Sequence, residues 1–288
     1  MELGLGSIVY EFAGIPLMRQ AELIASHGIR YVDVLAFGQY NPAFYGEQQQ
    51  ALVADAFKRY NLVASSIVTC ADGNIGSNDV DERKHAMDQL KRAAILVKRL
   101  GGKQVLIGKG CGNIDFYLSR QIATENAANV ISEYCKWCRE EGLLVTMELE
   151  PEALHVLNGI DAMAEMLKSV DCENLFANID IGHLNILREP PEMMEKLRRK
   201  IIHMHISDNE GLSHTNSVIG EGNADIRAYI CKALDMGIDD TARRAGDVAV
   251  AGIEIGEPGE YINDSDYRVL RSIGNIYLRV PEMREKQR

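Results

Sequence analysis

Short apolar runs alternate eight times along the chain with longer stretches of helical period. The apolar runs are LGLGSIVY, YVDVLAFG, LVASSIVT, KQVLIGKG, LLVTMELE, LFANIDIG, IIHMHISD and VAVAGIEIG. The helical stretches are residues 16–28, 47–60, 81–101, 119–142, 159–170, 189–200, 224–237 and 265–278. Because strands that alternate with helices pair in parallel, this order predicts βαβ units. Eight such units close naturally into a barrel, so we expect an α/β fold, a single (β/α)8 barrel over residues 1–288.

Glycine and proline fall where this interpretation needs the helices to begin and end. Glycines at four predicted helix ends suit the left-handed conformation found there: Gly28, Gly101, Gly142 and Gly237. Pro190 and Pro191 open the sixth predicted helix, where a missing N–H costs little. The loops after the second and seventh runs, residues 39–48 and 209–223, are the expected active-site loops, and 241–247 should be a structural passage.

Composition and charge exclude several classes of protein. Apolar residues make up 46% of the chain, enough for a large core, yet no apolar run reaches the roughly 18 residues that span a bilayer. The net charge of −11 disfavours nucleic acid, whose phosphates need clustered Lys and Arg. The N-terminal residues lack the basic region of a secretory signal, so a cytoplasmic protein is expected. Cys135 and Cys138 form a lone CxxC within a predicted helix and are expected to be packed or surface thiols.

Ionisable residues gather at the ends of four successive apolar runs. They are Glu148 and Glu150, then Asp180 followed by His183, then His203, His205 and Asp208, and finally Glu254. Buried carboxylates are costly in such strands unless they are paired or bind a metal. In a barrel these strand ends form the functional face. One Glu, one Asp, one His and one Glu converging there predict a cage of oxygen and nitrogen ligands, which suits Mn²⁺, Mg²⁺, Co²⁺ or a catalytic Zn²⁺.

The segment HMHISD places His203 and His205 on the same side of one strand. His205 lies nearer the strand end and is the expected metal ligand. His203 lies one layer deeper, either as a hydrogen-bonded core residue or as a support for a ligand. Asp208, at the strand exit, is expected to orient a ligand or to touch substrate. Lys109, which follows the fourth run, is either a solvated lysine or a cation for a phosphate, a carboxylate or a developing enolate.

These segments resemble the xylose-isomerase-like TIM barrels, the sugar isomerase and epimerase superfamily that includes inosose isomerase and the ketose 3-epimerases. GLLVTMELEPEALHVLN is similar to the fifth strand of that family, NIDIGH to its Asp-x-x-His strand and HMHISD to its seventh strand. HTNSVIGEGNADI resembles its loop after strand seven, with Ile219 in place of the usual proline, and GIEIG resembles its strand-eight glutamate. The resemblance covers essentially the whole chain.

The resemblance implies one bound divalent metal ion, with Mn²⁺ as first choice, and the ligands Glu148, Asp180, His205 and Glu254. Glu148 and Glu150 compete for the strand-five position. The intervals to Gly142 and Asn158 favour Glu148, whereas Glu150-Pro151 fits other members of the family. With Glu148 as ligand, Glu150 would line the pocket. His183 and His214 match histidines that lie at the substrate. The Arg and Glu that bind the sugar in the epimerases have no convincing match here, so the resemblance does not imply their substrate.

The implied reaction is isomerisation or epimerisation of a sugar, sugar acid or cyclitol through a cis-enediolate. The metal would bind adjacent carbonyl and hydroxyl oxygens and acidify the C–H bond between them. Glu148 and Glu254 would act both as ligands and as general base and acid. The alternative is a lyase, in which the same enediolate expels a β-substituent.

Two other classes of protein are disfavoured by the sequence. A phosphodiesterase of the AP-endonuclease type is disfavoured by the charge of −11 and by only seven histidines. A metabolite-binding barrel without activity is disfavoured by the complete ligand set. The expected partner is a small carbohydrate or cyclitol, with no nucleic acid and no membrane. The aromatic segment FGQYNPAFYG, residues 37–46, is interpreted as a lid that also meets a second copy of the chain.

Overall fold

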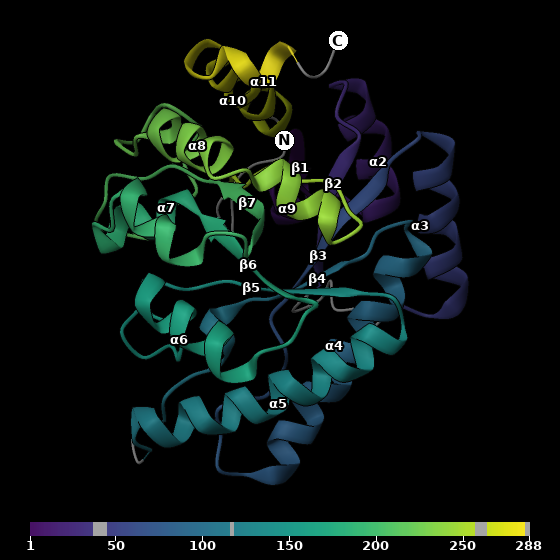
Figure 1. Cartoon of the computed structure of the whole chain (residues 1–288). Helices are drawn as coiled ribbons and strands as arrows, with labels where there is room; N and C mark the ends of the chain where they lie inside the picture. The colour runs from purple at the N-terminus through teal and green to yellow at the C-terminus, as the bar shows by residue number, and fades with distance from the viewer. Residues whose placement is uncertain (37–44, 116–117, 257–263, 286–288) are drawn as a thin grey trace.

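The computed structural model describes residues 1–36, 45–115, 118–256 and 264–285. Eight parallel strands pair in sequence order, and the last strand pairs with the first to close a barrel. They are β1 (Glu2–Gly6), β2 (Tyr31–Ala36), β3 (Val63–Thr69), β4 (Gln104–Ile107), β5 (Leu144–Met147), β6 (Leu175–Asp180), β7 (Ile201–Ile206) and β8 (Val250–Ile253). The strands lie at the centre with helices around them (Figure 1). The predicted (β/α)8 fold is confirmed.

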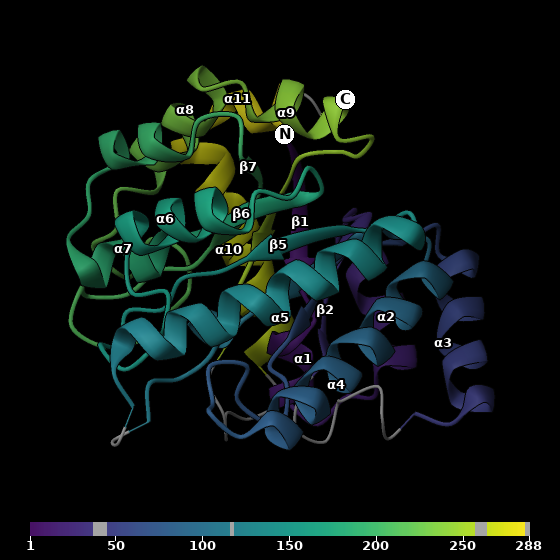
Figure 2. The same cartoon turned by 60° about the horizontal axis from the view of Figure 1, so that its bottom comes forward.

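Helices cover the outside of the barrel. They are α1 (Ile8–Phe12), α2 (Leu17–Ser26), α3 (Glu47–Arg59), α4 (Val80–Arg99), α5 (Arg120–Glu140), α6 (Ile160–Val170), α7 (Ile181–Leu187), α8 (Ile226–Asp235), α9 (Ile238–Arg244), α10 (Ser265–Arg279) and α11 (Pro281–Glu285). The described residues also contain the 3-10 segments η3 (Lys109–Cys111) and η4 (Pro191–Leu197). The two longest helices, α4 and α5, lie side by side (Figure 2).

The helix α4 has both the capping residue and the apolar spacing of an amphipathic helix. Asp79 caps its first turn by accepting hydrogen bonds from two backbone N–H groups. Ala86, Leu90, Ala93 and Val97 recur at helical spacing and are all buried. The apolar face therefore packs on the strands while the charged face meets solvent. Within the described part of the chain, no helix combines the length and the apolar character needed to cross a membrane.

The prediction of an α-helix over residues 189–200 was wrong. Only Pro191–Leu197 is helical, and it is a 3-10 segment. Pro190 and Pro191 stand at its N-cap and first position, where no helical hydrogen bond is lost, so the segment begins where the prolines were expected to open it. A helix begins earlier instead, directly after β6, because the Asp180 side chain accepts a hydrogen bond from the His183 backbone N–H at 2.9 Å. This side-chain cap converts the end of the predicted strand NIDIGH into α7.

Three smaller features of the fold concern α1, α9 and the cysteines. The end of the first apolar run, from Ile8, forms α1 rather than strand. The passage that includes residues 241–247 contains α9, separated from α8 by Gly237 in the left-handed conformation at φ 77°. All six cysteines are free, and Cys135 and Cys138 are buried in α5. The predicted aromatic lid, residues 37–46, lies almost wholly outside the described residues.

Candidate metal and substrate site

Four side chains from four successive strands meet at one end of the barrel and form a group that we call the cage. It consists of Glu148, Asp180, His205 and Glu254, whose ligand atoms all lie within 4.8 Å of one another. His205 Nδ1 lies 2.8 Å from Glu148 Oε1 and 2.8 Å from Glu254 Oε2. The barrel thus brings together the four residues that the sequence predicted as metal ligands, with Glu148 rather than Glu150 as the member from the fifth strand.

The charge of the cage fits a bound cation. Three carboxylates surround one imidazole in a largely buried space. Burial alone would lower the pKa of His205, but Glu148 and Glu254 outweigh it and raise that pKa well above its ordinary value. The opposite holds at Asp180, where burial raises the pKa but His183 and His205 lower it below its ordinary value. A donor set of carboxylate oxygens with one imidazole nitrogen suits a divalent ion.

Asp180 is held in place at the start of α7. Its Oδ1 accepts hydrogen bonds from the His183 N–H at 2.9 Å and from Ser207 Oγ at 2.6 Å. Ser207 Oγ in turn accepts from the Gly182 N–H at 3.1 Å. A Cβ atom at position 182 would lie 2.2 Å from Ser207 Oγ, so glycine is required for this close approach. The orientation of the Asp180 carboxylate is therefore set by β6, β7 and α7 together.

Beside the cage lies a second group, the rim, made of Glu150, His183 and His214. Their ligand atoms also fall within 4.8 Å of one another. His183 Nδ1 lies 2.7 Å from the carbonyl oxygen of Leu149, to which it donates. Burial raises the pKa of Glu150 to about 8, although His183 opposes that shift. Burial lowers the pKa of His183, but Asp180 and Glu150 outweigh it and raise the value to about 10. The rim therefore offers both hydrogen-bond donors and acceptors next to the cage.

Asp208 serves the loop after β7 rather than the cage. Its Oδ1 accepts from the backbone N–H groups of Asn209 and Ala224, and its Oδ2 accepts from those of Gly220 and Gly222. Asp208 is buried. Four backbone donors occupy its two oxygens, so Asp208 organises residues 209–224. Its expected contact with a ligand or with substrate stays a prediction.

Lys109 directly follows β4. It is exposed and lines a cavity of about 270 Å³ together with Asp72, Asn74 and Asp115. Burial raises the pKa of the half-buried Cys70 thiol, on which the charges of Lys109, Glu150 and Glu148 also act. Lys109 therefore lies at the same end of the barrel as the two glutamates, and its role toward a ligand stays a prediction.

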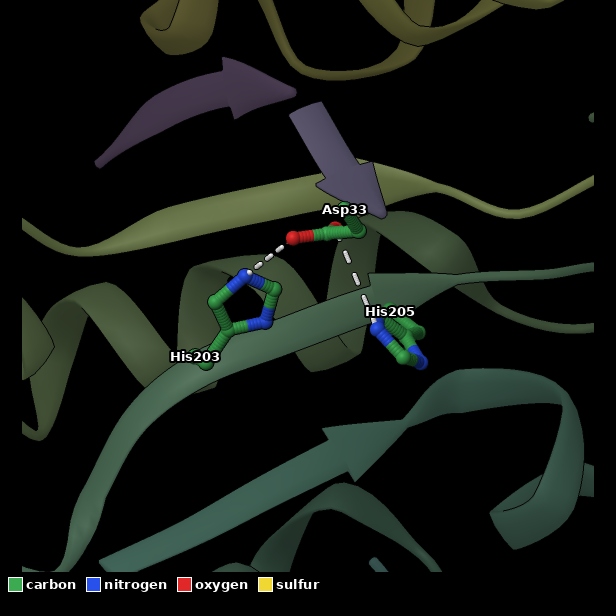
Figure 3. Close-up of side chains that lie close together, drawn as sticks. All are labelled: Asp33, His203 and His205. Atoms are coloured by element: carbon green, nitrogen blue, oxygen red, sulfur yellow. Dashed lines mark ion pairs between the residues drawn. The ribbon is translucent and has the colours of Figure 1, made fainter. Parts of the chain in front are cut away.

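Beneath the cage lies a third group, the floor, made of Asp33, Asn178 and His203. Asn178 Nδ2 donates to Glu148 Oε1 at 2.6 Å, and its Oδ1 lies 3.1 Å from His203 Nδ1. His203 Nε2 faces Asp33 Oδ1 at 2.9 Å, an ion pair drawn in Figure 3. Asp33 and Asn178 were not predicted from the sequence. Each is a polar residue inside an apolar run, Asp33 in YVDVLA and Asn178 in LFANI, but such a residue does not indicate which side chain it contacts.

Comparisons with known proteins agree with this architecture. Residues 21–242 match the family model described as the xylose isomerase-like TIM barrel. An uncharacterized protein of Methanocaldococcus jannaschii is 26% identical over 246 residues, which is 83% of this chain and 81% of that protein. Fructoselysine 3-epimerase of Escherichia coli O157:H7 is 25% identical over 168 residues, which is 58% of this chain and 60% of that enzyme.

A solved structure extends the likeness to the complete chain. The IOLI protein with a bound zinc atom superimposes with a TM-score of 0.81 at 16% sequence identity, over 98% of this chain and 99% of that one. At such identity the likeness concerns the fold. The family model, in contrast, spans most of the sequence, including three of the four cage residues. The chain therefore belongs to the xylose isomerase-like TIM barrel family.

Proposed function

We propose that this protein is a divalent-metal-dependent epimerase or isomerase of a sugar, sugar acid or cyclitol. The observation that carries the proposal is the cage, in which Glu148 and Glu254 approach the same nitrogen of His205 at 2.8 Å from two strands. Two relatives support it: one is a fructoselysine 3-epimerase, and the IOLI structure holds zinc. The residues of the cage fit a metal ion by donor type and charge.

Glu148, Asp180, His205 and Glu254 would hold the ion, which supplies Lewis-acid polarisation of a carbonyl and an adjacent hydroxyl. Glu148 and Glu254 directly follow β5 and β8. One carboxylate removes the proton from the hydroxyl-bearing carbon next to the carbonyl, and the other, carrying a proton, returns a proton to carbon. Return to the other face of the same carbon gives epimerisation. Return to the former carbonyl carbon, with the hydroxyl proton passing from one oxygen to the other, gives isomerisation.

The rim fits the remaining hydroxyl groups of such a substrate. Beside the cage the side chains of His183 and Glu150 are 4% and 12% exposed, and that of His214 is 32% exposed. His183 is fixed by Leu149, so its Nε2 points to a constant position. We propose that these three side chains bind sugar hydroxyls, which are both donors and acceptors of hydrogen bonds.

Two measurements test this function. Elemental analysis of the dialysed protein, wild type beside His205→Ala, should find about one divalent ion per chain that the variant loses. Ketoses and cyclitols are then incubated with the Mn²⁺-loaded enzyme in D₂O and followed by NMR. Deuterium should enter the substrate at one carbon, and Glu148→Gln or Glu254→Gln should slow this exchange by at least about 100-fold.

Glu152→Gln is the matched control, because Glu152 is an exposed neighbour on the same loop that is not part of the cage. It should retain most of the exchange rate. Absence of metal in the wild type, even after incubation with excess Mn²⁺, would overturn the proposal. Release of a substituent from the substrate, without a labelled epimer or isomer, would make the protein a lyase.

A further inference from the structure

A continuous line of side-chain contacts runs from β2 across the inside of the barrel to the cage. Asp33 Oδ1 accepts from Ser65 Oγ at 2.7 Å and lies 2.9 Å from His203 Nε2. His203 Nδ1 lies 3.1 Å from Asn178 Oδ1, and Asn178 Nδ2 donates to Glu148 Oε1 at 2.6 Å. Asp33, His203 and Asn178 are buried. The line therefore joins a carboxylate that is outside the cage to one that is inside it.

The chemistry of each group sets the direction of these contacts. A carboxylate accepts hydrogen bonds but does not donate them, so the amide of Asn178 must turn its Nδ2 toward Glu148. Its Oδ1 then faces His203, and an amide oxygen only accepts. His203 must therefore present a hydrogen at Nδ1, and its other nitrogen, Nε2, faces Asp33 Oδ1.

Asp33 holds His203 from the side opposite to Asn178. His203 Nε2 lies 2.9 Å from Asp33 Oδ1, and Ser65 Oγ donates to that same oxygen at 2.7 Å. With Asp33 on one side and Asn178 on the other, the buried ring of His203 has a fixed place inside the barrel. The position of the Asn178 amide, and of the Glu148 carboxylate to which it donates, follows from that place.

The absence of a side chain at Gly252 leaves space for the Asp33 carboxylate. A Cβ atom at Gly252 on β8 would lie 1.7 Å from Asp33 Oδ2, so any larger residue there would displace the carboxylate. The second oxygen of Asp33 lies 3.8 Å from His205 Nε2, the nitrogen that points away from Glu148 and Glu254 (Figure 3). Asp33 therefore stands beside both histidines of β7 at once.

We propose that Asp33 is a positioning residue which, through His203 and Asn178, fixes the orientation of Glu148 for metal binding and proton transfer. This inference rests on the proposed function for the role of the cage. Asp33 does not touch the ligand atoms of Glu148. Residues that orient a metal ligand from outside the coordination shell typically change metal affinity by 10- to 100-fold when they are removed.

The test measures Mn²⁺ affinity of the full-length protein by electron paramagnetic resonance, together with Tm. The variants are Asp33→Asn, which keeps the shape, and Asn178→Leu, which removes the contacts of Asn178 with Glu148, His203 and His205. Each should bind Mn²⁺ about 10- to 100-fold more weakly than the wild type. The matched control is Asn174→Leu: Asn174 is a buried Asn next to the other end of β6 that donates to the carbonyls of Cys135 and Leu143. It should lower Tm and leave the Mn²⁺ affinity within twofold.

A substitution at Gly252 tests the position of the Asp33 carboxylate while Asp33 itself is kept. Gly252→Ala should displace Asp33 and weaken Mn²⁺ binding to a similar degree. Gly4→Ala is its control, because Gly4 pairs with Gly252 across β1 and β8 but an added Cβ there would meet Val250 and the carbonyl of Tyr31. Gly4→Ala should change Tm alone. Affinity within twofold of the wild type in both Asp33→Asn and Gly252→Ala would overturn the inference.

Failure of the proposed function gives a different result. A wild type that binds no divalent ion would refute the metal site but not the line of contacts. The double variant Asp33→Asn, Asn178→Leu then decides. If the two residues act through His203, the double variant should lose about as much Tm as the worse single variant. Losses that simply add would show two independent structural residues and would overturn the positioning role.

Discussion

His183 and His214 face each other through their Nε2 atoms at 2.8 Å, with ring planes 88° apart. The two residues differ in their exposure. His183 is buried at the start of α7, whereas His214 belongs to the loop after β7 and has a side chain that is 32% exposed. A loop residue thus completes a buried group beside the cage, so the position of the loop and the shape of the rim depend on each other.

We therefore expect His214→Ala to weaken substrate binding rather than metal binding. Loss of one hydrogen-bonding partner in the rim removes about 1 kcal/mol, or roughly a fivefold to tenfold rise in KM. The affinity for Mn²⁺ should stay within twofold, because His214 is not in the cage. Steady-state kinetics and metal titration check both. His85→Ala, at an exposed position on α4, is the control, and an equal change in that variant would contradict the prediction.

Removal of metal should destabilise the protein. An ion present at 100 times its Kd stabilises the native state by about 2.7 kcal/mol. For a chain of this size we expect a rise in Tm of about 5–10 °C on adding Mn²⁺ to the chelator-treated protein. His205→Ala should show no such rise, since Glu148, Asp180 and Glu254 remain without their imidazole partner. Calorimetry measures both, and a rise of equal size in the variant would argue for binding elsewhere.

Glu11 predicts a pH dependence that is independent of the cage. Ser7 Oγ donates to its Oε1 at 2.5 Å, but burial dominates and raises the pKa of Glu11 from 4.5 to about 8. Between these two values the native state holds a proton that the unfolded state has released. The free energy of unfolding therefore falls as pH rises through this window, by at most about 1.4 kcal/mol per pH unit.

Glu11→Gln should remove that contribution and flatten the decline between pH 5 and 8. Urea unfolding at several pH values, compared with the wild type, isolates the difference from other titrating groups. Glu22→Gln, at a half-exposed position on α2, serves as the control and should keep the wild-type slope. Parallel pH profiles for wild type and Glu11→Gln would show that Glu11 is ionised in the native state.

Asp208→Asn should loosen the loop after β7. Replacing one acceptor oxygen by an NH₂ group leaves two backbone N–H groups among Gly220, Gly222, Asn209 and Ala224 without an acceptor. We expect a loss of about 2–4 kcal/mol and faster proteolysis within residues 209–224. Asp225→Asn, which retains a good cap for α8, should be nearly neutral. Unchanged proteolysis of Asp208→Asn would refute this role.

Much of the fold and the cage could be predicted because the signal is local. Each strand is one apolar run, and each cage residue lies at or just beyond the end of its own run. Parallel strands then carry Glu148, Asp180, His205 and Glu254 to the same edge without further information. The helix after β6 was missed because one side chain, that of Asp180, decides between strand and helix there.

The floor could not be predicted because its signal is not local. Asp33 and His203 are 170 residues apart, and β2 and β7 are not neighbours in the sheet. Only closure of the barrel, with β1 and β8 between them, brings the two side chains across the interior. A single Asp inside an apolar run has the same sequence signature whether it faces a helix, an ion or a histidine.

The close approach of Gly252 and Asp33 restricts how the sequence can vary. The Asp33 carboxylate, from β2, occupies the space that a side chain at position 252 of β8 would need, so neither residue can change freely while the other is kept. Among related chains, a residue with a side chain at position 252 should occur only where position 33 has lost its acid. The two columns of an alignment should vary as a pair, although the two residues are 219 positions apart in the sequence.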